Sequence, residues 1–218
     1  MHINGHEFEA AIFDFDGTLA DSMWVWNDVD ARFFAKRAIA IDPAAIEQVA
    51  VLGFESGADY VIEHFGLDES PESIIEEWKC SAYDGYAHRV ALKPGAREYV
   101  LACKRGGTPL AVATSLQRNL LEPALRNNGV LELFDALCVC DELHCGGKST
   151  PAVYLEAARL MGVEPARCVV FEDVARAARS AQETGAYVVG VYDGHEQQDT
   201  AELARVADFF IESWEQLL

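Results

Sequence analysis

The stretch Ile12-Phe13-Asp14-Phe15-Asp16-Gly17-Thr18 decides the fold of this chain. In it an apolar run ends in two acids spaced two residues apart, and a glycine and a threonine follow at once. A buried strand that ends in this way brings two carboxylates and a tight turn to one place. Because burying charge is costly unless a cation or a reaction uses it, we expect a functional site at this strand end.

Short apolar or β-branched runs recur along the chain and are predicted to be strands, at 10–15, 109–113, 136–140, 168–171, 187–191 and 208–211. Amphipathic helices are predicted around the later runs, at 95–106, 117–128, 151–162, 174–184 and 199–206. This alternation predicts an α/β fold, a Rossmann-like parallel sheet with helices on both faces. The carboxyl ends of its strands then share one edge, outside which ligands bind.

The alternation stops between Ser22 and Leu92, where the sequence shows no convincing strand. Four helices are predicted in this stretch, at 23–37, 43–51, 55–65 and 71–90. Asp42-Pro43 and Ser70-Pro71 suit two of the helix starts, with a capping side chain before a first-turn proline. We therefore expect an α/β core formed by 1–21 and 92–218, and an inserted all-helical cap formed by 22–91.

Composition limits the partners of the chain. Its 218 residues are 50% hydrophobic, and 17 basic against 36 acidic residues give a formal charge of −19. Such an acidic surface repels nucleic acid and anionic membranes, and no run reaches the roughly 18 apolar residues of a membrane span. The polar start, Met1 to Glu9, has no signal-peptide pattern, and we interpret the six cysteines as reduced thiols of a cytoplasmic protein. Either a monomer or a homodimer is compatible with the sequence.

Polar residues follow four of the predicted strands, at Asp14 and Asp16, Thr114 and Ser115, Lys148, and Glu172 and Asp173. Parallel strands would bring all of them to one sheet edge. Acids at two strand ends suit a hard divalent cation, and Mg²⁺ is typical where few carboxylates leave positions open for phosphate. A lysine beside a hydroxyl suits phosphate oxygens. A soft-metal site at Cys138-Val139-Cys140, with His144 and Cys145 following, is the weaker alternative, because structural zinc sites usually show a second paired cluster.

These motifs resemble those of the haloacid dehalogenase-like hydrolase superfamily over nearly the whole chain. The matching segments are 14–18, 113–115, 147–148 and 171–173, with further matches at 92–96 and 185–186. The all-helical insertion after the first motif is similar to the small cap of the β-phosphoglucomutase-like and phosphatase branch.

The resemblance implies a role for each core residue. Asp14 would attack phosphorus to form an aspartyl-phosphate, and Asp16 would carry the proton to the leaving oxygen and later from water. Thr114, Ser115 and Lys148 would bind the phosphoryl group. Haloacid dehalogenases lack the second aspartate, because halide needs no proton, so Asp16 favours a phosphate ester as substrate.

The resemblance also implies a magnesium site. Mg²⁺ would be held by Asp14, by the backbone carbonyl of Asp16 and by Asp173, with Glu172 assisting. The ion would let an anionic nucleophile approach an anionic phosphate.

Several positions depart from the family pattern. Val174 and Ala177 replace the usual serine and glycine of the fourth motif, and Ser149 and Ala152 replace a proline and an aspartate of the third. These changes put the helix entry and the support of Lys148 in doubt.

Cap residues bear on the type of reaction. Trp26 stands where phosphoglucomutases carry a histidine that gates the acid/base group, and 53–57 lacks their phosphate-gripping arginine. We expect Trp26, Gly53 and Phe54 to contribute to substrate binding. The phosphonatase branch needs a cap lysine, for which Lys36 and Lys79 are poorly placed.

The main hypothesis is therefore a Mg²⁺-dependent phosphatase acting on a small phosphorylated metabolite. A phosphoryl-transfer mutase stays open as an alternative. So does a weakly active member of the fold used for binding or regulation, which the altered third and fourth motifs would explain.

Overall fold

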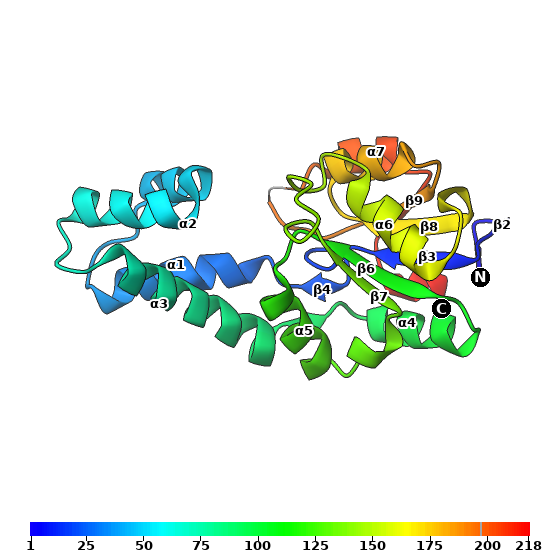
Figure 1. The fold of residues 1–218 in the computed structure, drawn as a ribbon, viewed down its shortest axis with the longest axis horizontal. Helices are drawn as coiled ribbons and strands as arrows, with labels where there is room; N and C mark the ends of the chain where they lie inside the picture. The colour runs from blue at the N-terminus through cyan, green and yellow to red at the C-terminus, as the bar shows by residue number, and fades with distance from the viewer. Residues whose placement is uncertain (197) are drawn as a thin grey trace. The chain divides into compact units, whose positions relative to one another are not determined.

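The chain is described by a computed structural model that covers residues 1–196 and 198–218, without the side chains of residues 50, 51 and 53. It divides into two compact units (Figure 1). The core unit comprises Met1–Met23 and Val90–Leu218, and the cap unit comprises Trp24–Arg89. The sequence prediction had placed the insertion two residues further out at each end.

The core unit contains a six-stranded parallel sheet in the order β10-β9-β8-β3-β6-β7, which confirms the predicted α/β fold. The strands span Ala10–Phe13 (β3), Leu110–Thr114 (β6), Ala136–Val139 (β7), Cys168–Glu172 (β8), Tyr187–Val191 (β9) and Phe209–Ile211 (β10). From β3 the chain proceeds outward through β6 and β7, then returns to the other side of β3 for β8, β9 and β10. This reversal makes the carboxyl end of β3 the switch point of the sheet, where ligands bind in such folds.

Five helices of the core unit agree with the predicted ones to within two residues. They span Ala96–Arg105 (α4), Arg118–Asn127 (α5), Ala152–Met161 (α6), Ala175–Gln182 (α7) and Thr200–Val206 (α8). Short 3₁₀ turns lie at Leu131–Leu133, Pro165–Arg167 and Trp214–Leu217. Within the described residues, no helix is both long and apolar enough to cross a membrane.

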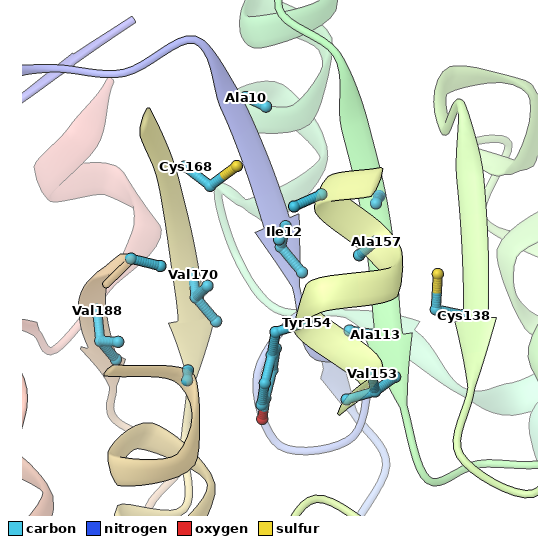
Figure 2. Packing of buried hydrophobic residues seen from close by; sticks show 14 of the residues in the cluster. Ala10, Ile12, Ala113, Cys138, Val153, Tyr154, Ala157, Cys168, Val170 and Val188 are labelled. Carbon is cyan, nitrogen blue, oxygen red and sulfur yellow. The ribbon is translucent and has the colours of Figure 1, made fainter. Parts of the chain in front are cut away.

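Alternating side chains of the strands build different packing on the two faces of the sheet. On one face Ile12 and Val170 join a cluster of mostly small residues beneath α6, which contributes Tyr154 and Ala157 (Figure 2). On the other face the packing is aromatic. The rings of Phe13 and Phe171 stack with centroids 4.8 Å apart, and they contact Tyr99 of α4 and Trp214. Both faces of β3 and β8 are therefore buried, as the continuous apolar runs predicted.

Two short antiparallel strand pairs were not predicted from the sequence. His2–Ile3 (β1) pairs with His6–Glu7 (β2) through a turn in which Asn4 and Gly5 both have positive φ. An Asn-Gly pair is the strongest short signal for such a turn, so this hairpin was readable from the sequence. Ala20–Asp21 (β4) pairs with Ala91–Leu92 (β5) and holds the two ends of the insertion side by side. These two-residue strands, 70 positions apart, leave no local pattern.

The cap unit consists of three helices rather than the four predicted. They are Trp24–Lys36 (α1), Pro43–Phe65 (α2) and Pro71–Asp84 (α3), with Asp42 and Ser70 as side-chain caps. The predicted break near Gly53 was wrong, because one glycine in a helix interior costs only about 1 kcal/mol and α2 continues through it. The last predicted helix is also corrected, since α3 ends at Asp84 and a π-helical segment, Gly85–Arg89, follows.

A buried arginine fastens the end of α1 to α3. The guanidinium of Arg37 donates to both carboxylate oxygens of Glu69, at 2.7 Å each, and to both of Glu77, at 2.9 Å each. It also lies 4.0 Å from the centroid of the Phe33 ring. Neighbouring Lys36 contacts the same Glu77 at 2.6 Å, but its side chain is 62% exposed against 7% for Arg37. Both bases therefore contact Glu77, but only Arg37 is buried and also binds Glu69.

We expect Arg37→Ala to lower the free energy of unfolding by about 3 kcal/mol, because it leaves partly buried Glu69 without a partner and Glu77 with exposed Lys36 alone. Lys36→Ala is the matched control and should cost less than about 1 kcal/mol, as exposed pairs do. Urea unfolding of both variants followed by tryptophan fluorescence measures the difference. Equal losses for the two variants would contradict this account of the Arg37 contacts.

Candidate active site

Three neighbouring strands end at one cavity. Asp14 directly follows β3, and its amide donates to the carbonyl of Phe171 at 3.0 Å, which prolongs the ladder between β3 and β8. Thr114 is the last residue of β6 and Glu172 the last of β8, the two strands that flank β3. A cavity of about 280 Å³ lies at these ends, and predicted residues from all four motifs line it: Asp14, Asp16, Thr114, Ser115, Lys148, Glu172 and Asp173.

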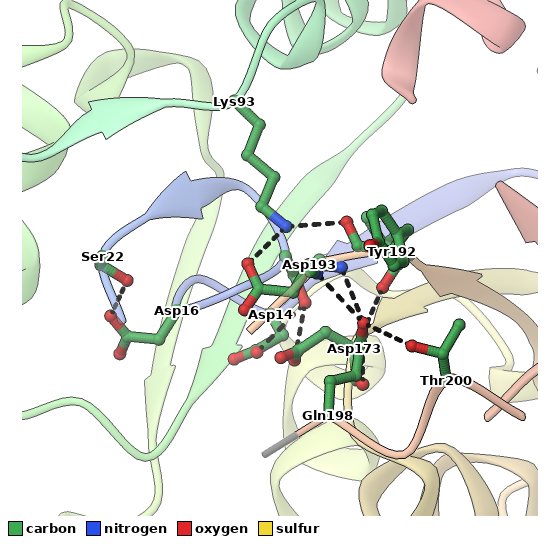
Figure 3. A network of polar contacts seen from close by, with 12 residues as sticks. Asp14, Asp16, Ser22, Lys93, Asp173, Tyr192, Asp193, Gln198 and Thr200 are labelled. Atoms are coloured by element: carbon green, nitrogen blue, oxygen red, sulfur yellow. Dashed lines mark hydrogen bonds and ion pairs between the residues drawn. The ribbon is translucent and has the colours of Figure 1, made fainter. Parts of the chain in front are cut away.

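A tight turn follows directly after the two aspartates of the first motif. Gly17 adopts a φ of 72°, its amide donates to the Ala20 carbonyl at 3.0 Å, and a Cβ there would overlap the Asp173 carboxylate. Only glycine fits this position without strain. Asp16 lies away from the other acids, and its Oδ1 accepts a 2.6 Å hydrogen bond from the Ser22 hydroxyl (Figure 3).

Asp14, Glu172 and Asp173 form a compact group of buried acids. One carboxylate oxygen from each lies within 4.8 Å of the others. The Thr18 hydroxyl lies between two of them, 3.2 Å from Asp14 Oδ2 and 3.1 Å from Asp173 Oδ1. Thr18 belongs to the first motif, but the sequence alone predicted no role for it. Its hydroxyl orients two of the three carboxylates.

Lys148 supplies the positive charge inside this group. Its ammonium contacts the Asp14 carboxylate and lies 2.6 Å from Glu172 Oε1, which also accepts a 2.7 Å hydrogen bond from the Tyr154 hydroxyl. Burial by itself would lower the pKa of Lys148, but Asp14 and Glu172 outweigh it and raise that pKa, so the ammonium stays charged. Tyr154 was not predicted as a site residue; its contact with Glu172 joins residues 18 positions apart.

The acids themselves are short of positive charge. Burial raises the pKa of Glu172 to about 7, with Asp14 adding to the shift and Lys148 opposing it. Burial, followed by repulsion from Asp14 and Glu172, also raises the pKa of Asp173 well above its ordinary value. Among the described residues, Lys148 is the one ammonium that contacts this group, so the three carboxylates in their ionised forms would leave a net negative charge in a buried space.

A hard divalent cation fits this arrangement. The donors are carboxylate oxygens, and Glu172 Oε2 is buried without a hydrogen-bond partner among the described residues. Oxygen-only donors with few carboxylates are typical of Mg²⁺ sites. In the described part of the chain this is the one group of three or more potential ligand side chains that could hold a metal, so the cysteines around Cys138 and Cys140 form no such group.

The motif departures have visible local effects. Val174 is the residue before α7 and offers no side-chain cap, and its side chain is half exposed. Ala152 offers no carboxylate near Lys148, whose support comes instead from Asp14 and Glu172. Lys148 is therefore held by acids at the ends of β3 and β8, although the usual aspartate of the third motif is replaced by Ala152. Thr114 Oγ1 accepts a 3.0 Å hydrogen bond from the Leu116 amide, which orients its side chain.

Two residues outside the predicted set hold the neighbouring loop. The Gln198 amide nitrogen donates to the carbonyls of Asp173 and Val191 at 2.9 Å, and its oxygen accepts from the Asp193 amide at 2.9 Å (Figure 3). Lys93 donates to the Tyr192 carbonyl at 2.9 Å and pairs with the Asp193 carboxylate at 2.7 Å. The 92–96 match flagged Lys93, whereas no sequence signal marked Gln198.

The predicted cap residues Trp26, Gly53 and Phe54 belong to the cap unit. Trp26 of α1 and Phe54 of α2 line one cavity of that unit, with ring centroids 5.9 Å apart. Gly53 lies in α2, but its surroundings are outside the described part of the structure.

The chain belongs to the haloacid dehalogenase-like hydrolase family, whose model matches residues 11–191. It is an enzyme of the phosphatase type within that family, because relatives similar to it over most of its length are named phosphatases.

Relatives of known activity support this class. The chain is 29% identical to validoxylamine A 7'-phosphate phosphatase of Streptomyces hygroscopicus subsp. limoneus, over 89% of this chain and 91% of the relative. It is 31% identical to hexitol phosphatase B of Escherichia coli strain K12, over 75% and 74%. The crystal structure of a putative beta-phosphoglucomutase from Thermotoga maritima shares the fold, with a TM-score of 0.82, 24% identity and 96% coverage of both chains.

The Tyr154 contact generates a prediction. Tyr154→Phe removes one donor to a buried carboxylate, so we expect the free energy of unfolding to fall by about 1–3 kcal/mol. Tyr187→Phe is the matched control, because that hydroxyl makes an exposed 3.4 Å contact with the Asp208 carbonyl and should cost less than about 0.5 kcal/mol. Thermal and urea unfolding give both values. A neutral Tyr154→Phe would show that the hydroxyl does not stabilise Glu172.

Proposed function

We propose that the chain is a Mg²⁺-dependent phosphatase that hydrolyses the phosphomonoester of a small metabolite through an aspartyl-phosphate intermediate. One observation carries the proposal. The Asp14 carboxylate lines a cavity together with a lysine, a hydroxyl and a second, separately held aspartate. This is the set of groups that a two-step phosphoryl transfer to a carboxylate requires.

In the first step a carboxylate oxygen of Asp14 attacks phosphorus, and the bond from phosphorus to the ester oxygen breaks. Asp16, in its protonated form, gives its proton to that oxygen, so the leaving group departs as a neutral alcohol. Lys148 and Thr114 interact with the phosphoryl oxygens as charge shifts among them. The Ser22 hydroxyl, 2.6 Å from Asp16 Oδ1, orients the proton carrier.

In the second step water attacks the phosphorus of the aspartyl-phosphate. Asp16, now ionised, takes a proton from that water, and the bond from phosphorus to Asp14 breaks. Inorganic phosphate leaves, and both aspartates return to their starting protonation states. The two acids have different partners, Lys148 and Thr18 for Asp14 and Ser22 for Asp16, which supports a separate role for each.

Asp14 and Asp173 would hold Mg²⁺, assisted by Glu172 and by the Asp16 carbonyl. When bound, the ion supplies positive charge that offsets the repulsion between the acids and the phosphate. The orphaned Glu172 Oε2 and the raised pKa values of Glu172 and Asp173 support a cation here.

Hydrolysis is preferred to phosphoryl transfer between two positions of a sugar. Trp26 cannot act as the gating histidine of the mutases, and no arginine occurs at 53–57. The two relatives above are both named as phosphatases, which supports the same choice. The six cysteines are free thiols, which supports the inference of a reducing, cytoplasmic location.

Asp14→Asn tests the nucleophile. The amide keeps the shape of the side chain but cannot attack phosphorus, so we expect hydrolysis of p-nitrophenyl phosphate to fall by at least about 10³-fold. Asp68→Asn, at an exposed position between α2 and α3, is the control and should retain full activity. Full activity in Asp14→Asn would overturn the assignment.

The intermediate has its own assay. Acid-quenched enzyme reacted with borohydride should carry homoserine at position 14, the reduction product of an acyl-phosphate, and Asp14→Asn should not. Undetectable turnover of a broad phosphate panel, with phosphate mimics still bound, would favour the binding or regulatory alternative. Isomerisation of a sugar phosphate without phosphate release would favour the mutase.

Metal removal is the next prediction. Chelation with EDTA should abolish turnover, and Mg²⁺ should restore it. Asp173→Asn should raise the Mg²⁺ concentration needed for half-maximal activity by roughly tenfold or more, the loss typical of a weakened metal site. Asp193→Asn, which pairs with Lys93 instead, should change that concentration much less. Unchanged activity in EDTA would contradict the metal site.

A further inference from the structure

The cap unit contains a cavity of its own. It has a volume of about 250 Å³ and lies among the three cap helices. Helix α1 contributes Trp26 and Asp30, α2 contributes Phe54, and α3 contributes Trp78; the remaining lining is aliphatic. All of these residues belong to one compact unit, so the cavity is a property of the cap itself.

Aromatic rings form much of its wall. The ring of Phe54 lies between two indoles, with centroids 5.9 Å from Trp26 and 6.0 Å from Trp78. Trp26 is 39% exposed, so the wall reaches solvent, whereas Trp78 is buried. The faces of aromatic rings carry partial negative charge and attract cations.

Asp30 is the one acid that lines this cavity. Burial raises its pKa to about 6, and no interaction opposes the shift. Within the described residues Asp30 has neither a hydrogen-bond donor nor an ion-pair partner. Partly buried carboxylates are normally paired, so this one lacks a positive partner.

The bases of the cap do not supply that partner. Arg32 pairs with Asp28 and Asp84. Arg89 pairs with the same two acids. Lys36 and Arg37 pair with acids near and on α3. The fifth base, Lys79, is exposed and makes no contact with Asp30 among the described residues.

The chemistry of the lining selects the ligand. An anion is disfavoured, because the cap has five basic against thirteen acidic residues, a formal charge of −8. A neutral apolar group would leave Asp30 unpaired. A hard metal ion needs several oxygen donors, and the lining offers one carboxylate. An organic cation can pair with the Asp30 carboxylate and also interact with the faces of the aromatic rings.

We propose that this cavity binds the ammonium group of a small organic molecule, held by the Asp30 carboxylate and the faces of Trp26, Phe54 and Trp78. The proposal goes beyond phosphate hydrolysis and does not depend on it. The ammonium group belongs either to a phosphorylated substrate or to a separate amine ligand, and the two sources are distinguished by experiment.

Choline and its neutral isostere 3,3-dimethylbutan-1-ol are the probes, titrated at pH 8 into the full chain while tryptophan fluorescence is recorded. We expect choline to bind at least about tenfold more tightly than the alcohol, the size of one good cation–ring contact or more. Asp30→Asn should abolish that difference. Asp28→Asn, an acid on the same helix paired with Arg32 and Arg89, should preserve it.

Equal binding of the two probes, or an Asp30→Asn variant that folds and keeps the preference, would overturn the proposal. Hydrolysis of phosphocholine and 3,3-dimethylbutyl phosphate identifies the source. A higher kcat/KM for phosphocholine that is lost in Asp30→Asn assigns the ammonium group to the substrate. Choline binding with equal kcat/KM assigns it to a separate ligand. Asp14→Asn should still bind choline, which separates this proposal from the catalytic one.

Discussion

The mutual repulsion of three buried carboxylates is the constraint on which the core unit depends. Asp14, Glu172 and Asp173 are held together at the ends of two neighbouring strands, and Lys148 is the ammonium among them. Such a group is costly in isolation: Asp14 contributes to the raised pKa of Glu172, and both contribute to the raised pKa of Asp173. It is stable only where hydrogen bonds, a lysine and a cation offset that cost, and where the surrounding structure prevents the acids from moving apart.

The parallel sheet keeps the three acids from moving apart. β3 and β8 are buried on both faces, by the small-residue cluster beneath α6 and by the aromatic packing around Phe13 and Phe171. Moving either strand end would disturb both layers. Around the acids, Thr18, Tyr154 and Gln198 add hydrogen bonds from three separate segments. The chemistry is therefore preorganised by packing that is not itself polar.

The cap unit also contains partly buried carboxylates, and they differ in whether a base pairs with them. Buried Arg37 satisfies two carboxylates at once and fastens α1 to α3, whereas Asp30 lies in an aromatic cavity without a partner among the described residues. Where an acid is paired, the role is structural; where a partly buried acid lacks a base, a ligand is the natural partner. This contrast, within one small helical unit, underlies the proposed ammonium site.

The sequence by itself determined the α/β class, the helical insertion and the residues from four motifs that gather at one sheet edge, because apolar periodicity and strand-end chemistry are local signals. The Asn4-Gly5 hairpin was equally readable and was overlooked. The continuity of α2, the pairing of β4 with β5, and the contacts of Tyr154, Gln198 and Asp30 were decided only by the tertiary structure. Each of these depends on partners distant in sequence, or on the absence of one, and neither leaves a pattern in neighbouring residues.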